Sequence, residues 1–424
     1  MRTLRIVACA LYFLAVAAIV LLPRPLFLGR WGWEMTLVFV FVAGLLFGPF
    51  RAWLNLITKS KTLCMPGGHP VPLRRRHRIA FLVGGLLLVL VPCEIAFRVN
   101  RLVGTPQLEE YHPFLQNRNR PGDERYHVNA HGFRGEEIAK RKPNGVFRVF
   151  FMGGSTVFCP NVEWEKSHVR LLEKKLRAAY PARRIEVMNA GVPWYTSQHT
   201  LINYLFHVRT FEPDLVVFMH GINDVFRSFS PVRFGYGAYR EDYSHHYGAV
   251  SRVILRSFPA DRQEGGAGSR FIDHVATSLV DRYARTDAEE VAIDDFKSLG
   301  AFARNVTAFA ERLRTDGVQV VLCTQPSLYR PDLDDEGRAR ATLRHVCLED
   351  GKFPDLESMA RAMQTYNATT RRIATRLGVP CVDLEASVPK TVEYFLDDCH
   401  YTEAGNRRMA DATFTFLQES LLFD

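Results

Sequence analysis

The sequence predicts an α/β protein whose main domain is a doubly wound parallel sheet in three layers, preceded by about three transmembrane helices. Two patterns lead to this prediction. Long apolar runs separated by basic residues fill the first 97 residues, whereas short apolar runs alternate with amphipathic stretches from residue 146 onward. A chain of 424 residues, 47% of them hydrophobic, has enough apolar surface to build both parts.

Three apolar runs near the N-terminus approach the roughly 20 residues that cross a bilayer. They cover residues 6–22, 35–54 and 79–97, within a membrane region of residues 1–97. A signal peptide is the alternative for the first run, but no small-residue cleavage site follows it and two more apolar runs do. We therefore expect three transmembrane helices.

Basic residues give the membrane region an orientation. The loop of residues 51–78 holds seven Lys or Arg, whereas the loop of residues 23–34 holds two. Because strongly basic loops stay in the cytoplasm, the chain after Phe97 is expected on the extracytoplasmic, periplasmic side. The sequence therefore predicts a multi-pass membrane protein with an exported domain.

The net charge argues against a nucleic-acid partner. Residues 1–78 carry eleven Lys or Arg and one acid, a net of +10, so the formal charge of +9 leaves −1 for the rest of the chain. A protein that binds nucleic acid presents its basic side chains on the folded domain. We therefore expect no nucleic-acid partner.

Cysteines in the exported domain predict a disulfide, since an oxidising compartment permits one. Cys347 and Cys399 are expected at the same edge of the sheet, so we predict a bond between them, with Cys159 as the competing partner and thiols as the alternative. No residues stand at metal-ligand spacing, and His245 and His246 are expected to be solvated loop residues. No metal is predicted.

The exported part begins with a polar lead-in, residues 98–145, in which residues 126–133 suit an edge hairpin. The catalytic domain, residues 146–424, follows. Its predicted strands are residues 147–152, 185–188, 215–219, 318–322 and 380–382. Its predicted helices are residues 163–179, 198–210, 294–315, 356–377 and 402–421. Strands that alternate with helices in this way form a parallel sheet with its active site at the carboxyl ends of the strands.

Two long interruptions follow strands of this sheet, at residues 228–292 and 327–355. Either segment suits the wall of a substrate cleft, and a solvated insertion is the alternative for both. Tyrosines in the first segment offer sugar-stacking rings, or they pack on their own domain; they are Tyr236, Tyr239, Tyr243 and Tyr247.

The first predicted strand ends in Gly153, Gly154 and Ser155. Glycines before a serine let the chain turn sharply and present the hydroxyl above the sheet. An ordinary loop or a phosphate-binding turn is the alternative for this motif alone. Ser155 is nevertheless the candidate nucleophile.

The third strand ends in Gly221, Ile222, Asn223 and Asp224. An asparagine there can aim its amide at a developing oxyanion, and the adjacent aspartate can fix the loop through backbone N–H groups. A turn built from Gly, Asn and Asp is the alternative.

Asp397 stands three residues before His400 and just before the last predicted helix. An aspartate at this spacing can orient the imidazole and stabilise its charged form. Together with Ser155, these residues are the candidate catalytic triad.

These blocks resemble those of the SGNH (GDSL-like) hydrolase superfamily, over about residues 148–421. The resemblance implies a flavodoxin-like sheet and a serine esterase or acyltransferase that needs no cofactor. Residues 189–198 resemble the family's second block, whose backbone N–H helps to bind the oxyanion. That donor falls at Trp194, with Gly191 as the alternative. The N–H of Ser155 and the amide of Asn223 would complete the oxyanion hole, with Gly154, Gly221 and Asp224 in support.

The chain departs from the family pattern at two positions. The usual Gly-Asp-Ser reads Gly153, Gly154, Ser155, and the glycine of the second block reads Trp194. An indole beside the nucleophile narrows the pocket or offers a stacking face for a sugar. The resemblance thus leaves the shape of the pocket open.

The expected activity is removal of O-acyl groups, acetyl first, from an extracytoplasmic glycan through an acyl-serine intermediate. The alternatives are an O-acyltransferase served by a membrane acyl-donor partner, a lipid esterase or thioesterase, and a noncatalytic glycan-binding assembly component. Membrane-tethered proteins that resemble this one often act on envelope or secreted polysaccharide, which favours a carbohydrate substrate.

Overall fold

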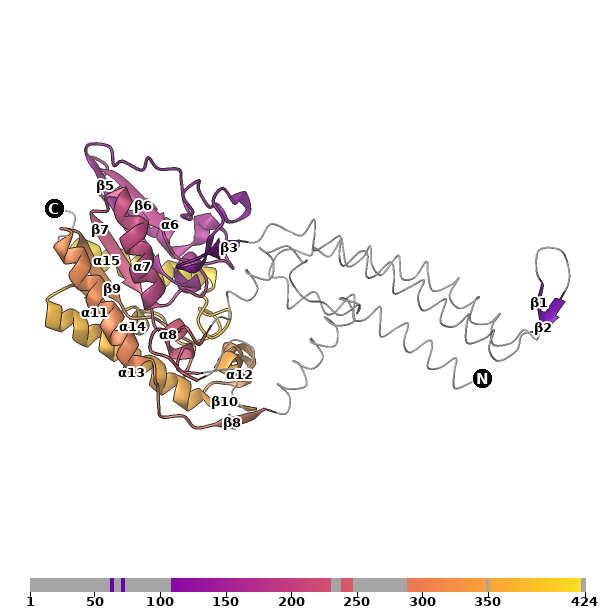
Figure 1. Ribbon diagram of the computed structural model, residues 1–424. Coiled ribbons are helices and arrows are strands. Elements are labelled where there is room, and N and C mark those ends of the chain that lie inside the picture. The colour runs from indigo at the N-terminus through magenta and orange to yellow at the C-terminus, as the bar shows by residue number, and fades with distance from the viewer. Residues whose placement is uncertain are drawn as a thin grey trace. The chain divides into compact units, whose positions relative to one another are not determined.

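The computed structural model describes residues 62–64, 70–72, 108–229, 238–246, 288–347 and 351–420 (Figure 1). The chain divides into two compact units, residues 1–106 with 264–284 and residues 107–263 with 285–424. In the first unit, strands β1 (Thr62–Cys64) and β2 (Pro70–Pro72) pair antiparallel.

The three expected membrane segments, residues 6–22, 35–54 and 79–97, lie outside the residues that the structure describes. Within the described ranges, no helix is both long and apolar enough to cross a bilayer.

A five-stranded parallel sheet forms the centre of the second unit. Its strands are β5 (Val146–Gly153), β6 (Arg184–Asn189), β7 (Leu215–Met219), β9 (Gln319–Cys323) and β11 (Cys381–Val382). They pair in the order β11-β9-β7-β5-β6, all parallel. The predicted doubly wound parallel sheet is therefore confirmed. The direction of winding reverses between β5 and β7, where open α/β sheets bind their ligands.

Helices cover both faces of the sheet. The main ones are α6 (His168–Ala179), α7 (Ser197–Phe206), α11 (Leu299–Thr315), α13 (Leu356–Leu377) and α15 (Glu403–Glu419). Right-handed crossovers place α7, α11 and α13 on one face and α6 with α15 on the other. The contacts agree, because α6 packs on α15 whereas α11 packs on α7 and α13.

Capping residues decide where these helices begin and end. The helix expected from residue 163 begins at residue 168, because the Ser167 side chain accepts the Arg170 N–H as an N-cap. Helix α13 begins after Asp355, whose side chain accepts the Ser358 N–H as an N-cap. It ends at Leu377, and its C-cap is Gly378 in the left-handed conformation, with φ 63°.

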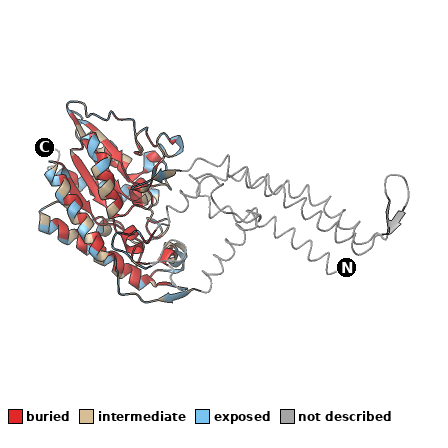
Figure 2. Cartoon of the chain, viewed as in Figure 1, coloured by how far each residue is buried: buried red, intermediate tan, exposed pale blue. Residues whose placement is uncertain are grey.

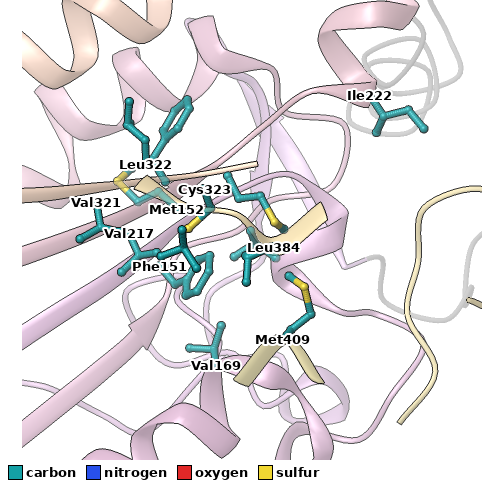
Figure 3. Close-up of a cluster of buried hydrophobic side chains, with 14 of the residues drawn as sticks. Phe151, Met152, Val169, Val217, Ile222, Val321, Leu322, Cys323, Leu384 and Met409 are labelled. Carbon is teal, nitrogen blue, oxygen red and sulfur yellow. The ribbon is translucent and has the colours of Figure 1, made fainter. Parts of the chain in front are cut away.

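The hydrophobic core lies on the two faces of the sheet, where the strands are drawn almost entirely as buried (Figure 2). Phe151, Val217 and Leu322, from three neighbouring strands, belong to one buried cluster (Figure 3). All three side chains are fully buried. Continuous apolar runs are what central parallel strands require, since helices cover both of their faces.

The lead-in folds differently from its prediction. Its hairpin is β3 (Glu109–His112) with β4 (Gln116–Asn119), whereas residues 126–133 contribute only a single bridge, Val128 to Arg134. The Tyr126 carbonyl of that stretch accepts a hydrogen bond from Arg134 Nε at 2.9 Å. The buried Arg134 guanidinium also donates to the carbonyls of Phe158, Cys159 and Val162. The expected edge hairpin at residues 126–133 is thus reduced to this one antiparallel bridge, beside which Arg134 also bridges Asn189 of the edge strand β6.

The predicted disulfide is also wrong. The cysteines of the described domain are all thiols: Cys159, Cys323, Cys347, Cys381 and Cys399. A 3-10 helix at Leu343–Cys347 does reach the loop that holds Cys399, but a carboxylate makes the connection. Asp398 accepts the Leu343 N–H at 2.7 Å and the Tyr329 hydroxyl. The competing partner Cys159 donates its thiol to Asn406 Oδ1 at 3.2 Å.

The two insertions meet in a small parallel ladder of β8 (Glu289–Val291) and β10 (Lys352–Pro354). The second insertion also forms α12 (Asp335–Arg340). In the first insertion, residues 230–237 and 247–287 lie outside the described residues, and with them Tyr236 and Tyr247.

Residues 238–246 of the first insertion pack onto the domain. Tyr243 is buried and donates its hydroxyl to Asp224 Oδ1 at 3.1 Å. His245 and His246 are buried too, so the expectation that they are solvated is wrong. They contact Arg227, with His246 Nδ1 at 2.7 Å from the guanidinium and His245 Nε2 at 2.9 Å from the Arg227 carbonyl.

Three buried histidines and the half-buried His207 make the fold sensitive to acid. Desolvation lowers the pKa of His168 and His207 to about 4, and that of His199 and His220 to about 3. The unfolded chain protonates histidines near their usual pKa of about 6.5. Between these values the unfolded state binds more protons, so stability falls as the pH falls.

Two buried carboxyls have the opposite effect on the stability at acid pH. Burial raises the pKa of Asp224 and Asp398 to about 6, so the folded state takes up their protons first. The four histidines lower the stability at acid pH by more than the two carboxyls raise it. Each additional proton that the unfolded state binds changes the free energy of unfolding by about 1.4 kcal/mol per pH unit. We expect urea unfolding at pH 7 and pH 5 to show a loss of several kcal/mol at pH 5. Equal stability at the two pH values would contradict this prediction.

Candidate active site

Ser155 stands at the carboxyl end of β5, as the first residue of the short helix α5 (Ser155–Phe158). A Cβ on Gly153 would lie 2.5 Å from the Met219 carbonyl oxygen, so this position has no room for a side chain. A Cβ on Gly154 would lie 2.7 Å from Asn223 Nδ2. The two glycines therefore let the ends of β5 and β7 approach each other, which brings the Asn223 amide next to the turn that carries Ser155.

His400 links Ser155 to Asp397. Its Nε2 lies 2.8 Å from Ser155 Oγ, and its Nδ1 lies 2.7 Å from Asp397 Oδ2. The other carboxylate oxygen, Oδ1, accepts the backbone N–H groups of Cys399 and His400, both at 2.9 Å. The loop thus fixes the carboxylate, the carboxylate fixes the imidazole, and the imidazole can accept the serine proton.

The pKa of Asp397 follows from these contacts. Burial opposes ionisation of this carboxyl, but the charge and hydrogen bond of His400 and the two backbone N–H donors outweigh burial and hold its pKa below the usual value. An ionised Asp397 favours the Nδ1–H tautomer of His400, which leaves Nε2 free to accept a proton.

The family comparison agrees with this geometry. The GDSL-like lipase/acylhydrolase family matches residues 151–408, more than half of the chain. The chain belongs to the GDSL-like lipase/acylhydrolase family. It is a hydrolase, an esterase or acylhydrolase by family.

The solved structures that match this chain include an alpha/beta hydrolase enzyme and an acetylxylan esterase. LAE5, an alpha/beta hydrolase from the metagenome of Lake Arreo, is 18% identical, with a TM-score of 0.37, over 64% of this chain and 95% of its own. Axe2, an acetylxylan esterase from Geobacillus stearothermophilus, is 16% identical, with a TM-score of 0.39, over 64% of this chain and 94% of its own. No curated protein matches the chain.

In this GDSL-like hydrolase, Asn223 lies on α8 (Ile222–Phe226), directly after β7. Its Nδ2 donates to the Tyr195 carbonyl at 2.9 Å, which accounts for one of the two amide hydrogens. Gly221 precedes it, and the following Ile222 N–H donates to Gln325 Oε1 at 3.0 Å. A side chain on Gly221 would press on Gln325, 3.1 Å from the added Cβ.

Asp224 is fully buried and ties α8 to the start of α7. It accepts the Ser197 hydroxyl at 2.6 Å and the Ser197 N–H at 3.0 Å. Its position is that of a loop-fixing residue rather than of a group that reaches the reacting atoms.

The two candidate oxyanion donors of the second block differ in the structure. The Gly191 N–H already donates to Asn189 Oδ1 at 2.9 Å, and a Cβ on Gly191 would lie 2.5 Å from the Phe158 nitrogen. Gly191 is therefore a packing position, and its N–H is engaged within the loop. Trp194 is half-buried, and its backbone lies in the left-handed region, with φ 66°. Trp194 stays the expected donor because of its place in the second-block motif.

Arg227 is a residue of the site that the sequence motifs do not reveal. It follows Asn223 by one helical turn, is fully buried, and donates from Nη2 to the Trp194 carbonyl at 3.2 Å. Burial lowers the pKa of its guanidinium to about 10. Its spacing from Asn223 was the available signal, but one arginine at that spacing predicts nothing without the fold.

One group of possible metal ligands occurs among the described residues: Asp397, Cys399 and His400. Both ring nitrogens of His400 already lie at hydrogen-bond distance from Asp397 and Ser155. Burial raises the pKa of the Cys399 thiol well above its usual value, which disfavours the thiolate that a metal requires. The donor set therefore suits proton transfer better than metal binding.

We expect Asn223→Ala to lower kcat by about 10² to 10³-fold, the usual loss for one oxyanion donor, with little change in KM. Asn223→Asp keeps the size but turns an acceptor toward the oxyanion, and should lose at least as much. The measurement is the hydrolysis rate of an activated acetyl ester. Full activity in Asn223→Ala would place the oxyanion hole elsewhere.

Proposed function

We propose that this protein is a serine esterase that removes O-acyl groups, acetyl first, from an extracytoplasmic glycan. The observation that carries the proposal is the continuous hydrogen-bonded chain from Ser155 Oγ through His400 to Asp397, with distances of 2.8 and 2.7 Å. Membership in the GDSL-like lipase/acylhydrolase family supports ester cleavage.

Each residue of the site has its own role in the reaction. Ser155 Oγ attacks the ester carbonyl while His400 Nε2 takes its proton and Asp397 stabilises the imidazolium. The N–H groups of Ser155 and Trp194, with the Asn223 amide, stabilise the tetrahedral oxyanion. The tetrahedral intermediate then collapses: the bond between the acyl carbon and the sugar oxygen breaks, and His400 gives the proton to that oxygen. The sugar leaves with a free hydroxyl, and an acyl-serine remains. Water, activated by His400, adds to the acyl-serine and releases the acid and the free Ser155 hydroxyl.

Two features support a glycan as the substrate. Trp194 is a half-buried aromatic residue in the loop that adjoins Asn223, and indole faces suit the apolar faces of sugars. The basic loop before residue 79 and the apolar runs around it favour a tethered domain outside the cytoplasm, where envelope polysaccharide is found.

The test supplies the purified full chain with acetylated oligosaccharides, with lipid esters and thioesters, and with an activated acetyl ester plus unmodified oligosaccharide. Mass spectrometry follows free acetate and acetylated sugar in each case, with Ser155→Ala as the control. We expect acetate release to be fastest from acetylated oligosaccharide. Acetylated sugar as the main product would identify a transferase instead, and preference for lipid esters or thioesters would exclude the glycan substrate.

We further propose that the catalytic domain is extracytoplasmic. A reporter that is active only outside the cytoplasm, fused after Asn144, should be active, and the same reporter fused within residues 51–78 should not. Activity of the second fusion but not the first would reverse the proposed topology.

A further inference from the structure

The second-block loop, residues 190–196, holds a bulky residue in a backbone conformation that favours glycine. Trp194 has φ 66°, in the left-handed region. A side chain in this conformation persists only where the surroundings fix the backbone on both sides. Two parts of the chain supply those contacts, α8 and the β3–β4 hairpin.

Helix α8 and the C-cap residue that follows it supply two of them, from within the family match. Asn223 Nδ2 donates to the Tyr195 carbonyl at 2.9 Å, and Arg227 Nη2 donates to the Trp194 carbonyl at 3.2 Å. The Asn223 amide therefore both faces the turn of Ser155 and holds the loop.

The β3–β4 hairpin supplies the others from outside the family match. Asn119 Nδ2 donates to the Gly191 carbonyl at 2.9 Å, and Asn117 Nδ2 donates to the Pro193 carbonyl at 3.2 Å. In return, the Tyr195 hydroxyl donates to the Asn117 carbonyl at 2.7 Å. These contacts lie on both sides of Trp194 along the chain.

The contacts between hairpin and loop are shielded from water. Asn117, Asn119 and Tyr195 are each 1% exposed. Leu115, in the turn of the hairpin, packs with Val192 and Tyr195 in a small cluster separate from the main core. Buried carbonyls that lost these donors would have no water to replace them, so the hairpin is coupled tightly to the loop conformation.

We propose that the β3–β4 hairpin is a positioning element of the oxyanion hole, in which Asn117 and Asn119 act as positioning residues through the second-block loop. This inference rests on the proposed function, because it assigns these residues to the oxyanion donors of that reaction. The hairpin fixes the direction of the Trp194 N–H and the place of the Tyr195 carbonyl, which in turn orients the Asn223 amide. Part of the active site thus precedes the family match at residue 151.

The test measures hydrolysis of an activated acetyl ester by variants of the full chain. Asn117→Ala and Asn119→Ala should each lower kcat by about ten- to a hundredfold with KM nearly unchanged, since a displaced donor weakens only the transition state. Tyr195→Phe removes only the hydroxyl that reaches β4 and should lower kcat by about three- to tenfold. It is the deciding variant if the asparagine variants do not fold.

The matched control is Glu110→Gln on the same hairpin, which breaks the partly exposed pair with Arg118 and leaves the loop contacts intact. It should keep wild-type kcat. Phenylboronic acid separates positioning from loss of fold, because its tetrahedral adduct with the serine places an oxygen where the oxyanion forms. Its Ki should rise in proportion to the fall in kcat/KM in the folded fraction of each variant.

Wild-type kcat in Tyr195→Phe and the asparagine variants, with Ser155→Ala inactive, would overturn the positioning role and leave the esterase assignment intact. A fall in activity that only follows the folded fraction, with the Ki unchanged, would overturn it as well. A wild-type chain that hydrolyses no ester would instead overturn the proposed function.

Discussion

Ser155→Ala and His400→Ala are each expected to lower kcat for an activated acetyl ester by on the order of 10⁶-fold, because neither residue can act without the other. The 2.8 Å contact between Ser155 Oγ and His400 Nε2 is the expected path of the proton. The double variant should therefore be no slower than either single variant. The measurement is the initial rate, together with labelling by a fluorophosphonate probe.

The matched control is Ser387→Ala. The Ser387 hydroxyl donates to the Asp383 carbonyl within the short helix α14 (Leu384–Ser387), and its loss should leave the rate unchanged. Labelling that persists in Ser155→Ala would show that another residue is the nucleophile. Losses that add up in the double variant would show that the two residues act separately.

Asp397→Asn should lower kcat by about 10⁴-fold through the wrong tautomer of His400. The loop determines this outcome, because Oδ1 of residue 397 is held by the N–H groups of Cys399 and His400. An asparagine would keep its oxygen toward these donors and present its NH₂ group to His400 Nδ1. The imidazole would then carry its proton on Nε2, where it could not accept the proton of Ser155.

The rate of Asp397→Asn against pH provides the measurement, with thermal unfolding as the check on folding. Asp398→Asn is the control: the Asp398 carboxylate holds the Tyr329 hydroxyl and the Leu343 N–H and does not contact His400, so it should affect stability far more than rate. Activity of Asp397→Asn within tenfold of wild type would mean that the imidazole does not depend on this carboxylate.

Local patterns in the sequence were sufficient for the sheet and for the ends of its strands. Buried parallel strands need continuous apolar runs, and each such run was visible, including the two-residue strand β11. Because parallel strands end at one edge, residues after β5 and β7 had to meet there, which is why Ser155 and Asn223 could be named together. Asp397 and His400 were found from their spacing before the last helix.

Only the tertiary structure decided which polar groups meet in the interior. Nothing in the sequence indicated that Asn117 would hold the carbonyl of Pro193, or that Arg227 would hold that of Trp194. The same reason explains the wrong expectations: Asp398 connects to Leu343 where a disulfide was predicted, and His246 is buried against Arg227.

The difference between what the sequence determined and what the tertiary structure decided has a physical cause. Burial of apolar residues repeats with the period of a helix or a strand, so the sequence by itself determined the α/β class, the strand positions and the candidate residues at the strand ends. A buried donor such as Asn119 is paired with whichever distant carbonyl lies within about 3 Å of it, and no local period records that partner. The conformation of the second-block loop, and the hairpin that holds it, were therefore decided by the tertiary structure alone.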